Sequence, residues 1–142
     1  MRRLIIMRHA EAETAPPGAD DFGRTLTPAG RAAARRAAER LHAEQGLPAL
    51  LLHSPALRTT ETARIVAETL APAVLRAIAV PGIYLAKGKT LQRLLEEPAH
   101  RADCVLLVGH NPGVSELLQL LDADAARTRR WLTPAEFAAI DR

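Results

Sequence analysis

The sequence predicts an α/β fold, namely a three-layer α/β/α sandwich around a mostly parallel central sheet. Three short apolar runs, at residues 4–7, 50–52 and 105–108, have the length and composition of strands that are buried on both faces. Longer segments with helix-start signals separate these runs, and strands that alternate with helices favour a parallel sheet with helices on both sides. Because 142 residues suit one hydrophobic core, we expect residues 1–142 to form a single domain.

Local signals indicate where the individual elements begin and end. Thr27 and Ser54 each stand directly before a proline, which is typical of a helix N-terminus, and Thr90 is a third candidate cap. Gly46 and Pro72 follow the first two of these helices. We expect helices over residues 28–43, 55–70 and 91–97, and from Pro112 to residue 121. We expect strands at residues 4–7, 49–52, 74–80 and 104–108, loops at residues 14–22 and 81–89, and either a strand or a helix at residues 135–140.

Cationic or imidazole side chains follow the three apolar runs at the point where each run ends. Arg8 and His9 follow the first run, Arg58 comes shortly after the second, and His110 comes directly after the third. Because ligands of parallel sheets bind beyond the carboxyl ends of the strands, we expect these four side chains to meet at one edge. Two guanidinium groups and nearby helix N-termini suit a tetrahedral oxyanion. The sequence therefore predicts a site for a multiply charged anion, of which phosphate is the usual one.

Two histidines within such a site indicate chemistry beyond binding. Neighbouring positive charge disfavours the imidazolium form, so at least one ring should stay neutral, with a nitrogen lone pair near phosphorus. Such a ring is an activated nucleophile. A metal site formed by His9, His53 and His110 is the main alternative, but the flanking arginines disfavour it and we expect no metal. A nucleophilic role for Ser54 is less favoured, because a capping role already explains this residue.

Other phosphate chemistries are excluded by counting residues. A cysteine phosphatase needs arginine six residues after its cysteine, and His110 stands at that distance from Cys104, the single cysteine. A P-loop has four residues between its glycines, whereas Gly82 and Gly88 are separated by five. Asp122 follows a predicted helix and not a strand, which disfavours an aspartyl nucleophile.

The composition also limits the partners. The isoelectric point of about 9.7 permits an anionic partner. However, the arginines are scattered among glutamates and aromatic residues make up only 3% of the chain, so we expect no nucleic-acid partner. The apolar runs are too short for a signal peptide or a membrane span, and we expect a cytoplasmic protein that does not associate with membranes.

Four motifs follow one another along the chain. They are Met7-Arg8-His9-Ala10, Arg24-x-Leu26-Thr27-x2-Gly30, Ser54-Pro55-x2-Arg58-x3-Thr62 and Val108-Gly109-His110-Asn111-Pro112. Together they resemble the motifs of the histidine phosphatase superfamily, which implies a phosphoglycerate mutase-like fold. The short chain, the Arg24 motif and the last motif most resemble SixA-type phosphohistidine phosphatases, although Ala10 stands where the family usually has glycine.

The resemblance implies a role for each of the candidate site residues. His9 would be transiently phosphorylated, and Arg8, Arg58 and His110 would hold the phosphoryl group. Arg24 and Asn111 would contact the substrate. Larger members of the family carry a proton-donating acid in the middle of the chain, but residues 71–95 contain no Asp or Glu here. Glu11 matches an acidic position after the first motif and is the candidate acid.

These features predict a cofactor-independent phosphatase that acts through phospho-His9, and phosphohistidine in a protein is its favoured substrate. One alternative is a small-molecule phosphomonoesterase or mutase of the same superfamily. Another is a non-catalytic module that binds phosphate or a phosphoprotein, although intact His9 and His110 argue against it. The expected partner is thus a phosphorylated protein or a small phosphorylated substrate.

Overall fold

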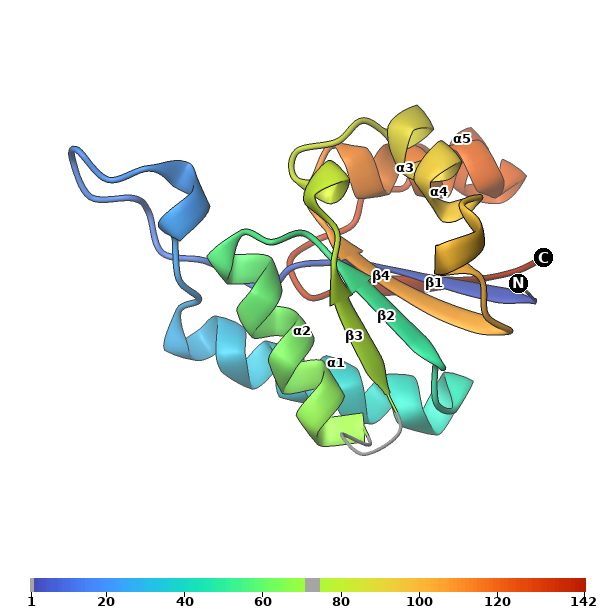
Figure 1. Cartoon of the computed structure of the whole chain (residues 1–142), viewed down its shortest axis with the longest axis horizontal. Helices are drawn as coiled ribbons and strands as arrows, with labels where there is room; N and C mark the ends of the chain where they lie inside the picture. Colours follow the sequence, from blue (N-terminus) through green and yellow to red (C-terminus); the bar gives the residue numbers. More distant parts are fainter. Residues whose placement is uncertain (1, 71–74) are drawn as a thin grey trace.

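The computed structural model describes residues 2–70 and 75–142, which form a five-stranded sheet with helices on both faces (Figure 1). The strand order is β3–β2–β4–β1–β5; the first four strands run parallel, and β5 is antiparallel to β1. The mostly parallel α/β architecture predicted from the sequence is therefore confirmed. The strands are β1 (Arg3–Arg8), β2 (Leu50–His53), β3 (Arg76–Ala79), β4 (Cys104–Gly109) and β5 (Phe137–Asp141).

The helices form the two outer layers of the sandwich. Figure 1 shows α1 and α2 below the sheet and α3, α4 and α5 above it. No helix within the described residues is long and apolar enough to cross a membrane. The α-helices are α1 (Pro28–Gln45), α2 (Leu57–Leu70), α3 (Gly88–Leu95), α4 (Gly113–Leu121) and α5 (Ala123–Thr128), and the 3-10 helices are η1 (Asp21–Gly23), η2 (Pro81–Ile83) and η3 (Pro98–His100).

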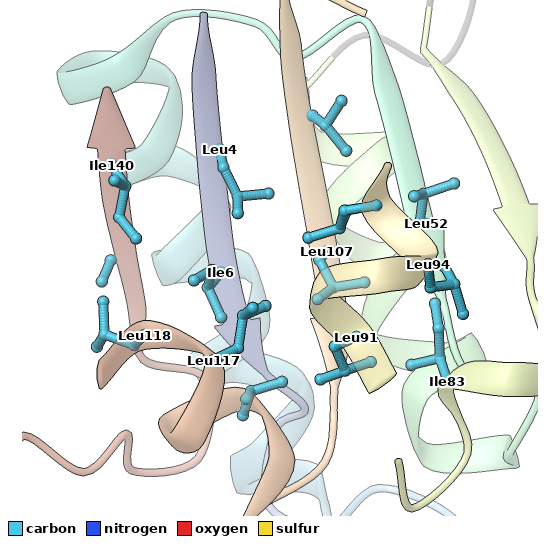
Figure 2. Close-up of a cluster of buried hydrophobic side chains, with 14 of the residues drawn as sticks. Leu4, Ile6, Leu52, Ile83, Leu91, Leu94, Leu107, Leu117, Leu118 and Ile140 are labelled. Carbon is cyan, nitrogen blue, oxygen red and sulfur yellow. The ribbon is translucent and has the colours of Figure 1, made fainter. Parts of the chain in front are cut away.

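The central strands are apolar on both faces because helices cover both faces. Residues 4–7 of β1 are completely buried. Since side chains alternate along a strand, Leu4 and Ile6 belong to the core beneath α3 and α4, whereas Ile5 and Met7 belong to the core against α1 and α2. The two apolar layers hold the strand ends in fixed positions. Figure 2 shows the first core, in which the strand residues meet Leu91, Leu94, Leu117 and Leu118.

Helix α1 begins at the predicted cap and ends at Gln45, two residues beyond the expected residue 43 and directly before Gly46. The hydroxyl of Thr27 accepts a hydrogen bond of 2.9 Å from the backbone N–H of Gly30, as a helix cap does. At the other end, Gly46 has a φ of 78°, a conformation that glycine adopts without strain. Buried alanines of α1 allow it to pack closely against α2 and the sheet.

Two other helices begin at residues that local signals did not predict. Helix α2 begins at Leu57 and not at residue 55, because Ser54 lies in the turn before it and accepts from the N–H of Ala56 (3.2 Å). Helix α3 begins at Gly88, ahead of Thr90, because the carboxylate of Glu116 in α4 accepts the Gly88 N–H (2.9 Å). A contact between distant segments thus replaces the expected cap of α3.

Two further segments of the sequence are strands. The segment expected as either a strand or a helix at residues 135–140 contains most of strand β5 (Phe137–Asp141), which pairs antiparallel with β1 at one edge of the sheet. The strand expected at residues 74–80 is confirmed as the shorter β3, at the other edge. Residue 74 and Pro72 lie outside the described residues.

Candidate active site

Strands β1 and β4 place His9 and His110 next to each other. Arg8 at the end of β1 pairs with Gly109 at the end of β4, and the backbone N–H of His9 donates to the carbonyl oxygen of Gly109 (3.0 Å). The two imidazole rings that follow are 5.4 Å apart between centroids, edge to face. Both residues are buried, with 9% of His9 and 3% of His110 exposed. The expectation that parallel strand ends bring these rings together is met.

A main-chain contact fixes the tautomer of His9. Its Nδ1 lies 2.7 Å from the carbonyl oxygen of Ala10, and because a carbonyl can only accept, Nδ1 carries the proton. The lone pair of the neutral ring is therefore on Nε2. The pKa of His9 is lowered to about 4, mainly by burial; the bond to Ala10 opposes this shift, and the positive charges of Arg58 and Arg8 add to it. His9 is therefore a neutral ring at neutral pH.

His110 is also neutral, for similar reasons. Burial is the main cause that lowers the pKa of His110 to about 3, and the charge of Arg58 adds to it. A hydrogen bond of 2.7 Å joins its Nε2 to the hydroxyl of Ser54. Its ring also meets the edge of Tyr84, at 5.4 Å between centroids. Ser54, read from the sequence as a helix cap, thus orients a site histidine instead.

Two arginines, the buried Arg58 and the half-buried Arg8, flank the histidines. Arg58 in α2 is only 2% exposed, and Arg8 donates from Nη1 to the carbonyl oxygen of Leu132 (3.2 Å). Within the described part of the chain, Nε of each arginine and Nδ1 of His110 are buried without a hydrogen-bond partner. Buried polar groups are normally paired, so these nitrogens indicate where a ligand would complete the site. The two unpaired cationic N–H groups suit an anion.

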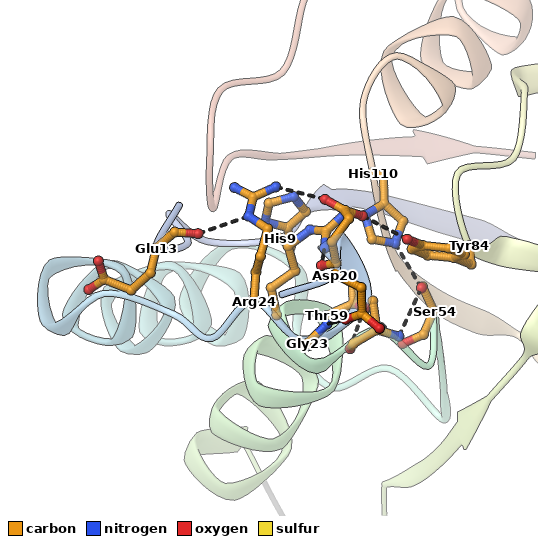
Figure 3. Close-up of polar contacts among 12 residues, drawn as sticks. His9, Glu13, Asp20, Gly23, Arg24, Ser54, Thr59, Tyr84 and His110 are labelled. Carbon is orange, nitrogen blue, oxygen red and sulfur yellow. Dashed lines mark hydrogen bonds and ion pairs between the residues drawn. The ribbon is translucent and has the colours of Figure 1, made fainter. Parts of the chain in front are cut away.

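Asp21 is a site residue that the sequence analysis missed. Its carboxylate accepts hydrogen bonds from Tyr84 Oη (2.7 Å), Arg24 Nη1 (3.0 Å) and Arg58 Nη2 (3.0 Å). These hydrogen bonds hold the pKa of Asp21 far below its usual range, and the bond from Tyr84 contributes most. Figure 3 shows the rings of His9 and Tyr84 on either side of His110, and Arg24 with its bond to Glu13. The sequence offered one signal for this role: Asp21 stands three residues before Arg24, a spacing at which the two side chains can form an ion pair.

Glu11 and Asn111 make contacts away from the histidines. Glu11 is exposed, and its carboxylate accepts from the hydroxyl of Thr27 (2.8 Å) at the N-terminus of α1. The amide of Asn111 donates to the carbonyl of Leu132 (2.8 Å) and accepts from Ser115 (2.6 Å). These contacts do not bring either side chain to His9, so their roles in acid catalysis and substrate binding stay predictions.

Arg24 reaches the site from the loop after β1. Its Nε donates to the carbonyl oxygen of Glu13 (2.8 Å) and its Nη1 to Asp21, and its charge contributes to lowering the pKa of both site histidines. The site therefore gathers five residues from four separate places in the sequence, namely the adjacent Arg8 and His9, and Arg24, Arg58 and His110. Among the described residues, no group of three or more His, Cys, Asp or Glu side chains has the arrangement of a metal site.

A mostly parallel α/β sandwich that presents two neutral histidines between arginines at its strand ends is an arrangement suited to phosphoryl transfer. A model of the histidine phosphatase superfamily (branch 1) matches residues 4–81. The chain belongs to this superfamily of phosphatases, as its four motifs indicated. Comparison with curated protein sequences gave no match.

Solved structures place the chain close to SixA proteins. A candidate phosphohistidine phosphatase SixA from Agrobacterium tumefaciens is 28% identical with a TM-score of 0.88, over 99% of this chain and 92% of that chain. The protein histidine phosphatase SixA complexed with tungstate is 26% identical with a TM-score of 0.80, over 96% and 86%. A candidate SixA from Nakamurella multipartitia is 25% identical with a TM-score of 0.76, over 97% and 83%.

Proposed function

We propose that this protein is a cofactor-independent phosphohistidine phosphatase that acts through a phosphohistidine intermediate on His9. The observation that carries the proposal is the state of His9, which is buried and neutral, with its Nδ1 proton held by Ala10 and its lone pair on Nε2. The two arginines beside it supply positive charge for a phosphoryl group. Similarity to the three SixA structures supports phosphohistidine as the substrate class.

The proposed reaction has two displacements at phosphorus. In the first, the lone pair on His9 Nε2 forms a bond to phosphorus, and the bond from phosphorus to the leaving group breaks, with its electron pair going to the leaving group. In the second, a water oxygen bonds to phosphorus, both hydrogens stay with the product phosphate, and the electron pair of the N–P bond returns to Nε2. Arg8 and Arg58 stabilise the charge on the other phosphoryl oxygens throughout.

The leaving group explains why a phosphohistidine substrate suits this chain. An ester releases an alkoxide, which needs a proton from a general acid. The imidazole of phosphohistidine can instead take up a proton from the aqueous solution on its other ring nitrogen before the N–P bond breaks, and it then departs as a neutral ring. Residues 71–95 offer no carboxylate, and the carboxylate of Glu11 is hydrogen-bonded to Thr27. A site so arranged favours cleavage of N–P bonds, and the natural partner would be a phosphorylated protein.

A turnover screen of the purified protein tests this proposal. The substrates are a histidine-phosphorylated protein, phosphoramidate and a panel of phosphate esters, and the variant is His9→Ala. We expect orthophosphate release from the N–P substrates and none with His9→Ala, whose thermal unfolding should remain cooperative. Faster turnover of an ester would indicate a small-molecule phosphatase or mutase. Binding of phosphate without turnover of any substrate would indicate a binding module.

A further inference from the structure

The carboxylate of Asp21 holds two of the arginines that a phosphoryl group would need. Arg58 donates from Nη2 to this carboxylate (3.0 Å) and from Nη1 to the carbonyl oxygen of the same residue (2.8 Å). Arg24 donates to the other carboxylate oxygen (3.0 Å). Both terminal nitrogens of Arg58 thus contact Asp21, while its buried Nε has no partner among the described residues.

A carboxylate and a phosphoryl group compete for guanidinium groups because both are bound through the same N–H groups. An N–H of Arg58 or Arg24 that points at Asp21 cannot point at a phosphoryl oxygen at the same time. The hydroxyl of Tyr84 donates to the same carboxylate oxygen of Asp21 that Arg58 contacts, and its ring packs against Phe22 at 5.1 Å between centroids. The carboxylate of Asp21 therefore accepts from three donors, two of which are guanidinium groups.

The same residue lies on a segment that can move away at small cost. Asp21 begins η1, a single turn with no buried residue, and 42% of its side chain is exposed. Arg58, in contrast, is fixed in α2 with 3% of its side chain exposed. An exchange of anions would therefore move Asp21 and leave the arginine in place. Few buried contacts are lost when such a segment opens.

We propose that Asp21 is an internal competitor for the anion site, which holds Arg58 and Arg24 until a phosphoryl group displaces its carboxylate. Asp21 then sets both the affinity of the site and its preference for doubly charged ligands. A phosphoryl dianion interacts with two guanidinium groups more strongly than one carboxylate does, whereas a singly charged anion has no such advantage. This inference rests on the proposed function, because it concerns the same arginines.

Equilibrium binding of inorganic phosphate to Asp21→Asn tests the inference. The variant keeps the shape of the side chain and removes the charge that competes for the arginines. We expect phosphate to bind roughly ten-fold more tightly than to the unmodified protein, as removal of one charge-assisted hydrogen bond allows. Isothermal titration calorimetry measures the Kd, and thermal unfolding shows whether the variant is folded.

Asp20→Asn is the matched control for the loss of charge. Asp20 is the neighbouring residue, and its carboxylate accepts from the N–H of Gly23 (3.0 Å) without contacting either arginine. Because an exposed charge at this position interacts only weakly with the site, its phosphate Kd should change by less than about two-fold. An equal gain in both variants would show general charge repulsion and would overturn direct competition.

Tyr84→Phe provides an independent variant, because it removes one donor to Asp21 and keeps both guanidinium groups and the ring beside His110. It should also bind phosphate more tightly, by a smaller factor, and it decides the question if Asp21→Asn does not fold. Unchanged or weaker phosphate binding in the folded variants would overturn the inference and assign Asp21 to positioning Arg58. That result would leave the proposed function intact, whereas a protein that binds no phosphate in any form would refute both.

Discussion

Acidification should destabilise this protein through its two active-site histidines. Burial holds the pKa of His9 at about 4 and that of His110 at about 3, whereas the unfolded chain has histidines near 6.5. Between these values the unfolded state binds more protons than the folded state. Stability is therefore fully present above pH 6.5 and is lost as the pH falls from 6.5 towards the folded pKa values.

The size of the effect follows from the number of protons. Between pH 7.5 and 5.5, an unfolded histidine takes up most of one proton, while folded His9 and His110 take up almost none. Each histidine then lowers the free energy of unfolding by roughly 1 kcal/mol between pH 7.5 and 5.5, and the pair lowers it by roughly 2–3 kcal/mol. A loss of this size is a large part of the stability of an ordinary domain.

Urea denaturation at pH 7.5 and 5.5 measures this loss directly. Single variants His9→Gln and His110→Gln should each reduce the pH dependence of the unfolding free energy by roughly 1 kcal/mol, and the double variant by roughly 2–3 kcal/mol. Burial also lowers the pKa of His53, so a part of the pH dependence should remain in the double variant. His42→Gln, at an exposed position on α1, is the control. An unfolding free energy whose pH dependence is the same in the double variant and the unmodified protein would refute the neutral, buried state of both rings.

Three further predictions concern the metal, the substrate and the core. Because the arginines already supply the positive charge, activity should survive dialysis against EDTA; activity that returns only with zinc or magnesium would favour a metal site. The kcat/KM for phosphoramidate should exceed that for alkyl phosphates by at least ~10²-fold, and Glu11→Gln should slow ester hydrolysis more than phosphoramidate hydrolysis; equal values for both substrate classes would show that a strong acid lies elsewhere. Leu117→Ala, at a fully buried position of α4 that faces the sheet, should lower the unfolding free energy measured in urea by about 2–5 kcal/mol, and a loss of less than about 1 kcal/mol would contradict the packing in Figure 2.

The sequence was sufficient for the parts of the fold that depend on neighbouring residues. The apolar runs predicted β1, β2 and β4 because buried strands must be apolar on both faces. Thr27 predicted the start of α1 because its hydroxyl bonds to a residue only three positions away. Since parallel strands end at one edge, the same runs also predicted that His9 and His110 would meet.

Contacts between distant residues account for what the sequence did not show. The start of α3 depends on Glu116, which is 28 positions from Gly88. The role of Asp21 depends on Arg58 and Tyr84, which are 37 and 63 positions away. No local pattern marks such partners, so Asp21 read as an ordinary loop residue. The choice of strand for the last segment likewise depends on pairing with β1.

Rapid-quench trapping of the intermediate tests the central claim most directly. The protein is mixed with a radiolabelled phosphodonor, quenched within the first turnover and digested, and the labelled peptide is identified. The account predicts a label on His9 that is stable in base and labile in acid, and no label with His9→Ala. A label on another residue, or full turnover by folded His9→Ala, would contradict the account.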